Sequence, residues 1–312
     1  MSGHVVALSG GVGGAKLVHG LSLALPDASL TAIVNTGDDF RHLGLHVSPD
    51  IDSVLYALSG LSDPERGWGR RAETWTFMTA LKGLRGETWF NLGDGDLAMH
   101  VERSWRLSQG ETLTQATARA CAALGIHPRV LPMSDEPVRT RLRTDEGWLD
   151  FQDYFVGHQC RPRVHEIAYE GAEVAQALPA ALEALARPDL RAVVICPSNP
   201  FLSIEPMLAM PALRAALANA PAPVIAVTPI IGGKALKGPA AKLMAELGLE
   251  VGNETVARRY AGLAQVFVAD SSDPLPGVVP GVRMAQAQTI MHTDDDRRML
   301  AEAVLALADA AR

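Results

Sequence analysis

Short apolar runs, separated by polar or glycine-rich turns and by helical patterns, recur along the chain. The runs cover residues 5–8, 30–34, 192–196, 223–228 and 265–269. Runs of this length without polar alternation are typical of parallel strands that are covered on both faces. Helical patterns are strongest over residues 111–124, 174–187 and 294–311. Strands that alternate with helices predict an α/β fold with a doubly wound, mostly parallel, Rossmann-like sheet.

A different pattern interrupts this alternation near the middle of the chain. Residues 148–156 alternate apolar and polar side chains after the turn at residues 145–147. Such alternation predicts a strand or hairpin. Together with residues 161–171 it indicates a small β-rich insert. We therefore expect a nucleotide-binding core of residues 1–137 and 173–312 and an insert of residues 138–172.

The first apolar run ends in a glycine-rich turn, and Lys16 then opens a helical pattern. A glycine turn between a strand and a helix presents backbone N–H groups and the positive end of the helix dipole, which together bind phosphate. The turn lacks the Gly-Lys-Ser/Thr of a P-loop and the last glycine of the dinucleotide fingerprint. A turn that only packs the helix on the sheet is the alternative. The candidate phosphate-binding residues are Gly10, Gly11, Gly13, Gly14 and Lys16.

Two later apolar runs also end in polar turns. Ser198 and Asn199 follow residues 192–196, and Thr228 ends the run 223–228 ahead of Lys234 and Lys237. Because the carboxyl ends of parallel strands meet at one edge of a sheet, these turns are expected to line the same crevice as the glycine turn. They are further candidates for phosphate binding. Solvated surface lysines are the alternative interpretation of Lys234 and Lys237.

Carboxylates gather after the second apolar run. Residues 35–39 read Asn-Thr-Gly-Asp-Asp, and Pro49 and Asp50 then begin a predicted helix. We expect Asp50 to point into the crevice and to be the catalytic carboxylate. Acidic turns hold hard divalent cations through oxygen ligands, although Asx turns and helix-dipole contacts are commoner uses. The candidate metal ligands are Asp38, Asp39, Asp94 and Asp96.

Net charge, cysteine content and the length of the apolar runs exclude several classes of protein. The chain has 312 residues and a formal net charge of -7, which argues against a broad nucleic-acid-binding surface. Its 3 cysteines have no metal-ligand spacing and favour a reducing compartment without disulfides. There is no basic signal-peptide start and no apolar run long enough to cross a bilayer. We expect a cytoplasmic protein that binds neither nucleic acid nor a membrane.

Several motifs, taken in order, carry a family resemblance. They read SGGVGGAK, VNTGDD, SPDIDSVLYALSG, DPERGWGRRAETW, WFNLGDGDLAMH, LPMSDEPV, PSNPFLSIEPML and PVIAVTPIIGGKALKGPAAK. Each is weak alone, but the ordered set runs from Ser9 to Lys242. In this set the chain resembles the 2-phospho-L-lactate transferases of coenzyme F-420 biosynthesis. Two positions depart from the family pattern: Gly95 stands where Arg is usual, and Asn91 where some members have Lys near the deazaflavin.

The resemblance implies a reaction and its partners. Family members move a phospholactyl, phosphoenolpyruvyl or phosphoglyceryl unit from a guanosine diphosphate-type donor to the ribityl hydroxyl of the deazaflavin FO. GMP is released, and Mg²⁺ is the implied cofactor. The resemblance places Asp50, Trp75 and Asn91 at the deazaflavin and the glycine and lysine turns at the donor. It also implies a homodimer.

Two other functions remain open. A related branch resembles a sugar-nucleotide-binding regulator that shares the glycine turn and the aspartate-led helix but lacks residues 67–75 and 89–98 of this pattern. A nicotinamide dehydrogenase is disfavoured by the missing third glycine. It is also disfavoured by Asn35, which follows the second strand where a ribose-binding acid usually lies.

Overall fold

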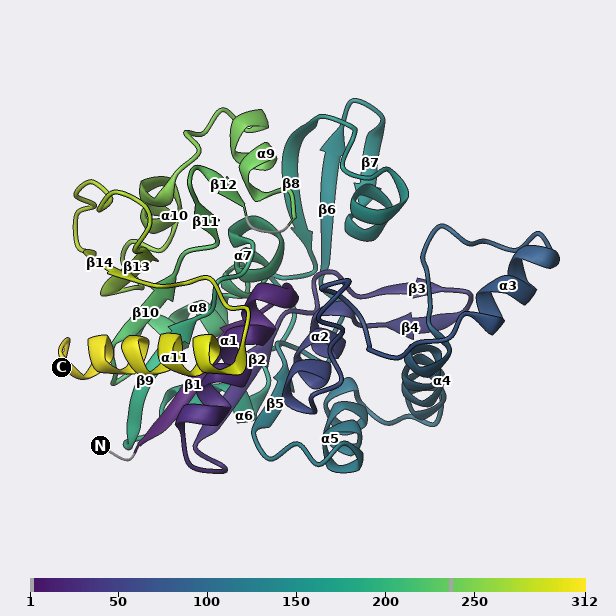
Figure 1. The fold of residues 1–312 in the computed structure, drawn as a ribbon, viewed down its shortest axis with the longest axis horizontal. Coiled ribbons are helices and arrows are strands. Elements are labelled where there is room, and N and C mark those ends of the chain that lie inside the picture. Colours follow the sequence, from purple (N-terminus) through teal and green to yellow (C-terminus); the bar gives the residue numbers. More distant parts are fainter. Residues whose placement is uncertain (1–2, 236–237) are drawn as a thin grey trace.

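A parallel sheet of seven strands forms the centre of the molecule in the computed structural model, which describes residues 3–235 and 238–312 (Figure 1). Its order is β14-β13-β10-β9-β1-β2-β5, and every neighbouring pair is parallel. The strands are β1 (His4–Ser9), β2 (Leu30–Val34), β5 (Arg129–Pro132), β9 (Leu190–Ile195), β10 (Val224–Val227), β13 (Val266–Asp270) and β14 (Arg283–Ala287). The predicted doubly wound α/β fold is confirmed.

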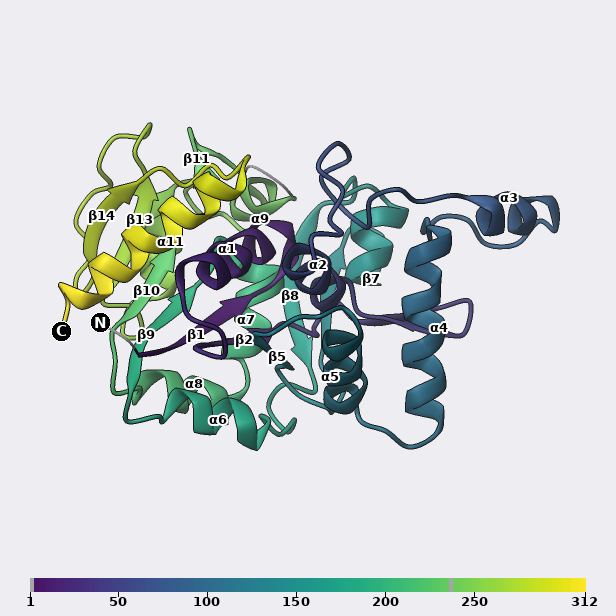
Figure 2. The ribbon, with the colours of Figure 1, turned by 60° about the horizontal axis from the view of Figure 1, so that its bottom comes forward.

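Helices cover both faces of this sheet because successive strand side chains point to opposite sides. In β1, Val5 and Ala7 join one core cluster, whereas Val6 and Leu8 join the other. Figure 2 shows α1 and α11 above the sheet and α6 and α8 below it. The first face carries α1 (Gly11–Ala24), α2 (Pro49–Leu58), α5 (Leu113–Ala123) and α11 (Asp294–Asp309). The second carries α6 (Pro179–Leu185), α7 (Glu205–Leu208), α8 (Pro211–Ala218), α9 (Ala240–Glu246) and α10 (Asn253–Arg259).

Helix α1 begins earlier than the sequence pattern predicts, at Gly11 and not at Lys16. The glycines therefore form its first turn and let it approach the sheet closely. A Cβ atom at Gly13 would collide with the carbonyl oxygen of Pro197. At Gly14 it would lie 2.5 Å from the hydroxyl oxygens of Ser9 and Ser198. Tight packing, the alternative interpretation of this turn, thus explains both glycines structurally.

A second, three-stranded antiparallel sheet lies within the expected insert, in the order β7-β6-β8. Its strands are β6 (Arg139–Thr144), β7 (Gly147–Asp150) and β8 (Val164–Glu170). The expectation of a strand through residues 148–156 is wrong beyond Asp150, because residues 151–157 form helical turns that end in the π-helix Asp153–Gly157. Phe151 and Phe155 are four residues apart and stack in this turn. The predicted helix over 174–187 is also shorter and begins at Pro179.

A hairpin and two helices extend away from the central sheet on one side (Figure 1). The hairpin consists of β3 (Phe40–His42) and β4 (Leu45–Val47), and the helices are α3 (Thr76–Gly83) and α4 (Asp94–Ser108). A smaller hairpin, β11 (Ile230–Ile231) with β12 (Lys234–Ala235), follows β10. The short π-helix Pro200–Ile204 leads into α7.

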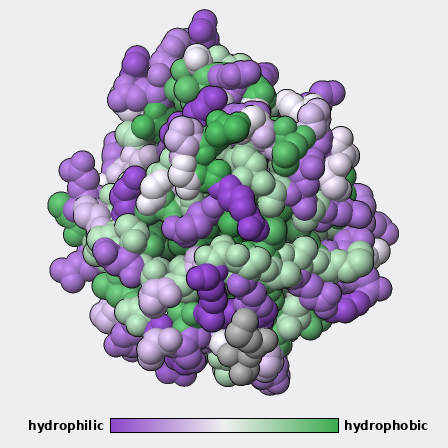
Figure 3. Space-filling view, turned by 90° about the vertical axis from the view of Figure 1, so that its left-hand side faces the viewer, coloured by the Kyte–Doolittle hydropathy of each residue, from purple (hydrophilic) through white to green (hydrophobic). Residues whose placement is uncertain are grey.

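No described helix has both the length and the hydropathy of a membrane span by itself. Only the pair Pro200–Leu208 and Pro211–Ala218 has both jointly, across an 89° bend. The first segment of that pair is almost wholly buried, whereas the second buries only Leu213 and Leu217 in the core of the second face. On the face that carries α11 and β14, apolar and polar residues are interspersed (Figure 3).

Candidate active site

The polar turns that follow β1, β2 and β9 meet around the start of α2. The backbone N–H of Gly10 donates to Ser198 Oγ (3.1 Å). The N–H of Gly11 donates to Asp50 Oδ1 (2.5 Å), and Asn35 Nδ2 donates to Asp50 Oδ2 (2.9 Å). Asp50 is thus held between the glycine turn and the acidic turn, at the carboxyl edge of the sheet. This is where ligands bind in open α/β folds.

Asp38 and Asp50 are buried carboxyl groups joined through one amide. Asn35 Nδ2 lies 3.4 Å from Asp38 Oδ1 and also donates to Asp50. Burial raises the pKa of Asp50 to about 6, although the hydrogen bonds from Asn35 and Gly11 oppose this. Burial and the neighbouring carboxylates of Asp50 and Asp39 raise the pKa of Asp38 well above its usual range. The raised pKa values mean that the two groups resist carrying negative charge together, and a bound cation would favour their ionised forms.

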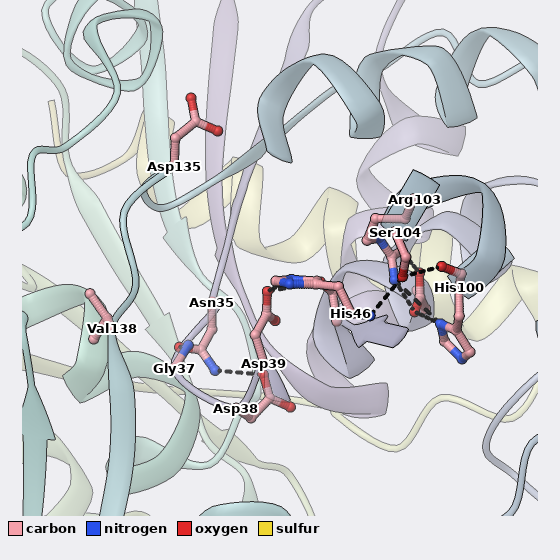
Figure 4. A network of polar contacts seen from close by, with 12 residues as sticks. Asn35, Gly37, Asp38, Asp39, His46, His100, Arg103, Ser104, Asp135 and Val138 are labelled. Carbon is pink, nitrogen blue, oxygen red and sulfur yellow. Dashed lines mark hydrogen bonds and ion pairs between the residues drawn. The ribbon is translucent and has the colours of Figure 1, made fainter. Parts of the chain in front are cut away.

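Asp39 faces the other side of the same turn (Figure 4). Its Oδ2 accepts a hydrogen bond from Ser48 Oγ (2.8 Å) and lies 3.0 Å from His46 Nε2. Its Oδ1 is buried without a hydrogen-bond partner. Carboxylate oxygens are the ligands that Mg²⁺ prefers. Asp39 Oδ1 is therefore open to a cation, although Asp38, Asp39 and Asp50 are not a set of described residues whose ligand atoms all lie within 4.8 Å of one another.

Asp94 and Asp96, the other metal candidates, have structural partners. Asp94 accepts hydrogen bonds from the Thr74 hydroxyl and from the N–H groups of Thr76 and Phe77, and so caps α3. The Thr74 hydrogen bond is the main cause that lowers the pKa of Asp94. Asp96 accepts a hydrogen bond from the Tyr56 hydroxyl (2.5 Å). These contacts tie α3 and α4 to their neighbours.

Asp96 also belongs to a buried cluster between α2 and α4. His100 lies between Asp52 (Nδ1, 3.6 Å) and Asp96 (Nε2, 3.3 Å). The three ligand atoms lie within 4.8 Å of one another, which is close enough for a metal ion. Both oxygens of Asp52, however, already accept hydrogen bonds from the guanidinium of Arg103. The cluster is therefore an ion-pair network that holds the two helices together. Figure 4 labels two of its members, His100 and Arg103, beside His46.

The predicted phosphate-binding lysines and polar turns have varied surroundings. Lys16 Nζ donates to the carbonyl oxygen of Met291 (2.7 Å). Asn199 Oδ1 caps the Pro200–Ile204 turn, while its Nδ2 is buried without a partner. The Thr228 hydroxyl contacts Asn253 Oδ1 (2.5 Å). Lys234 is exposed in β12, and Lys237 lies outside the described residues.

In the described part of the chain, Trp75 and Asn91, the predicted deazaflavin contacts, form no hydrogen bond with Asp50. The Trp75 ring lies 5.1 Å from the guanidinium of Arg66, and Asn91 is exposed. At Gly95, the space that a side chain would take is occupied by the guanidinium of Arg70. A larger residue at this position would therefore need the flexible side chain of Arg70 to move.

Two amides contact the buried carboxylates, and sequence reasoning gave neither of them a role. The turn of residues 35–39 was expected to face the crevice because it follows β2, but the contact of Asn35 with Asp50 was not foreseen. Gln152 donates through Nε2 to Asp38 Oδ2 (3.3 Å) from the insert. Nothing local marked it, since its segment reads as a strand and folds as a helical turn.

Comparisons with known proteins agree with this architecture. The family model described as 2-phospho-L-lactate transferase CofD matches residues 5–309. A 2-phospho-L-lactate transferase of Methanosarcina mazei is 37% identical over 96% of this chain and 99% of its own. A phosphoenolpyruvate transferase of Streptomyces griseus is 39% identical over 99% of both chains.

Solved structures show the same fold. The crystal structure of a member of the UPF0052 family from Bacillus halodurans superposes with a TM-score of 0.62 and covers 98% of this chain and 99% of its own. Its 16% sequence identity supports the fold alone. By the family match over nearly the whole chain and by its close relatives, this protein belongs to the 2-phospho-L-lactate transferase CofD family of transferase enzymes.

Proposed function

We propose that this protein transfers a phospho-carboxylic acid unit from a guanosine diphosphate-type donor to the ribityl hydroxyl of the deazaflavin FO in coenzyme F-420 biosynthesis. The family supports this class of reaction, and relatives named for phospholactate and for phosphoenolpyruvate are similarly close. The observation that carries the proposal is the buried Asp50, which accepts hydrogen bonds from both the glycine turn and Asn35. The donor acid is lactyl, enolpyruvyl or glyceryl.

The proposed roles follow from the chemistry of the transfer. The ribityl oxygen attacks the phosphorus that bears the acid, the bond from this phosphorus to the GMP oxygen breaks, and GMP leaves. Asp50 orients the ribityl hydroxyl and accepts its proton. With a pKa of about 6, this carboxylate is mostly ionised at neutral pH, yet basic enough to act as a general base.

The donor diphosphate is proposed to bind at the start of α1. The first N–H groups of a helix have no partner within it, and they carry its positive dipole end. Two backbone N–H groups at this end already donate hydrogen bonds, that of Gly10 to Ser198 Oγ and that of Gly11 to Asp50 Oδ1. The next N–H groups, at Val12 and Gly13, donate to no side chain among the described residues, and we propose that they bind the anion. A Gly13→Val substitution is a poor test, because the side chain would collide with Pro197 whether or not a phosphate binds there.

Asp38 and Asp39 are the proposed magnesium ligands, and Asp50 is a further candidate. Their oxygens fit a hard cation, and Asp39 Oδ1 is buried without another partner. When bound, Mg²⁺ would neutralise charge on the donor phosphates. Asp94 and Asp96 are less suited to bind the cation. Asp94 caps α3, and Asp96 accepts a hydrogen bond from the Tyr56 hydroxyl.

Titration of the deazaflavin's fluorescence with the protein tests the proposal against the regulator. The transferase is expected to change that fluorescence saturably, whereas a sugar-nucleotide-binding regulator would leave it unchanged. For the residue role, Asp50→Asn is expected to lower turnover about 100- to 10,000-fold at saturating Mg²⁺. Asp27→Asn, at an exposed carboxylate, is the matched control.

The magnesium dependence separates the two possible roles of Asp50. If Asp50 is a ligand, Asp50→Asn raises the Mg²⁺ concentration needed for half-maximal rate. If it is the base, the maximal rate falls and that concentration stays the same. Wild-type turnover of Asp50→Asn at every Mg²⁺ concentration would contradict both roles.

A further inference from the structure

The insert reaches the acidic turn at two points. The N–H of Thr140, in β6, donates to the carbonyl oxygen of Gly37 (2.7 Å). Gln152 Nε2, in the helical turns after β7, donates to Asp38 Oδ2 (3.3 Å). Gly37 makes the close approach possible, since a Cβ there would lie 2.8 Å from Thr140 Oγ1. The insert therefore borders the carboxylates directly.

Packing on both sides of Gln152 fixes its direction. Gln152 is 5% exposed, and Tyr154, two residues on, is fully buried. The Tyr154 hydroxyl accepts a hydrogen bond from Lys242 Nζ (3.2 Å), which also donates to the Pro162 carbonyl oxygen (2.9 Å). The turn is thus anchored to α9 on one side and contacts Asp38 on the other. A side chain held in this way can set the orientation of its partner.

Each oxygen of Asp38 faces one amide. Asn35 Nδ2 lies 3.4 Å from Oδ1, but it donates over a shorter distance, 2.9 Å, to Asp50. Gln152 approaches Oδ2, and its amide makes no hydrogen bond to Asp50. Two neutral amides do not cancel the carboxylate charge, but they fix the plane in which its oxygens lie. Gln152 is the donor that acts on Asp38 separately from Asp50.

We propose that Gln152 is a positioning residue that orients Asp38 toward the divalent cation, so that the insert forms one wall of the active site. This inference rests on the proposed function. Partners that orient ligating carboxylates typically change metal affinity 10- to 100-fold when they are removed. Gln152 touches neither substrate, and it acts only through the position of Asp38.

Substitution Gln152→Met removes the amide but keeps an unbranched side chain of similar length. Gln176→Met, at an exposed glutamine whose side chain makes no hydrogen bond to a described residue, is the matched control. Binding of Mn²⁺ alone, followed by the electron paramagnetic resonance signal of the free ion, needs no substrate. Gln152→Met is expected to weaken Mn²⁺ binding about 10-fold, and Gln176→Met to leave it unchanged. Should Gln152→Met fail to fold, Gln152→Asn withdraws the same amide and carries the same expectation.

The same measurement in an Asp38→Asn background separates positioning from a general structural effect. If Gln152 acts through Asp38, Gln152→Met adds no further loss once Asp38 has been replaced. Equal losses in both backgrounds, or wild-type Mn²⁺ affinity in the single variant, would overturn the inference. Wild-type protein that binds no Mn²⁺ would overturn it together with the cation site. Wild-type protein that binds Mn²⁺ but forms no transfer product would contradict only the proposed reaction.

Discussion

Asp50 is a carboxyl group whose burial and hydrogen bonds act in opposite directions. Its oxygens accept from Gly11 and Asn35, yet burial dominates and raises its pKa to about 6. An unfolded aspartate has a pKa of about 3.9. Between these values the folded protein binds more protons at Asp50 than the unfolded chain does. The contribution of Asp50 to stability is therefore complete below about pH 4 and is lost as the pH rises through about 6.

The direction of this pH dependence gives a prediction for the metal-free protein. We expect the free energy of unfolding of wild type, relative to Asp50→Asn, to fall by about 2 kcal/mol between pH 4 and pH 7. Chemical denaturation of both proteins with a chelator present measures the difference. A relative stability that rises with pH over this range would show that the carboxylate, and not the neutral acid, is the favoured form in the fold.

At the residue scale, the sequence identified carboxylates that lie at local signals and missed a contact that depends on the tertiary fold. Asp38 was found because a turn after a strand lies at the ligand edge, and Asp50 because Pro49 and Asp50 begin a helix. The sequence did not reveal that Asp94 caps α3, because its hydrogen-bond donors Thr74 and Phe77 lie 20 and 17 residues away. Gln152 reaches Asp38 across 114 residues. Contacts of such separation depend on the tertiary fold and leave no local pattern.

Helix α4 is held to α2 by a buried ion pair, which makes this element sensitive to one substitution. Arg103 is 4% exposed, and its guanidinium donates to both oxygens of Asp52. Arg103→Met would leave Asp52 buried without its counter-charge. The expected loss in the free energy of unfolding is about 3–5 kcal/mol.

Arg106→Met is the matched control on the same helix, because Arg106 pairs with Glu102 and Glu111 nearer the surface. Its expected loss is at most about 1 kcal/mol. Urea denaturation of the two variants measures both values. Similar losses in the two variants would mean that the Arg103 pair does not hold α4 in place.

Helices and strands with a clear hydrophobic pattern in the sequence could be predicted, and those without one could not. The apolar runs of β1, β2, β9, β10 and β13 are buried on both faces, so their strands were read directly. The hairpin Phe40–Val47 has strands of only three residues, too short for a periodic signal. The start of α1 was placed too late because glycine disfavours helices, whereas here close packing on the sheet requires it.

At the scale of the whole molecule, the proposed site lies where three parts meet. The carboxyl edge of the main sheet supplies the start of α1 and Asp50, the acidic turn leads into the β3–β4 hairpin, and the insert supplies Gln152 (Figure 1). The resemblance over residues 9–242 indicated the family, and the family match over 5–309 bears it out. The identity of the donor acid is set by contacts that neither the motifs nor the fold specify.

The most direct test of this account is mass analysis of the product after the protein is incubated with FO, Mg²⁺ and each of the three guanosine diphosphate-linked acids in turn. We predict that at least one donor converts FO into its phosphodiester with release of one equivalent of GMP, and that omission of Mg²⁺ abolishes the conversion. Unchanged FO with all three donors, in protein that is folded and binds FO, would contradict the proposed transfer.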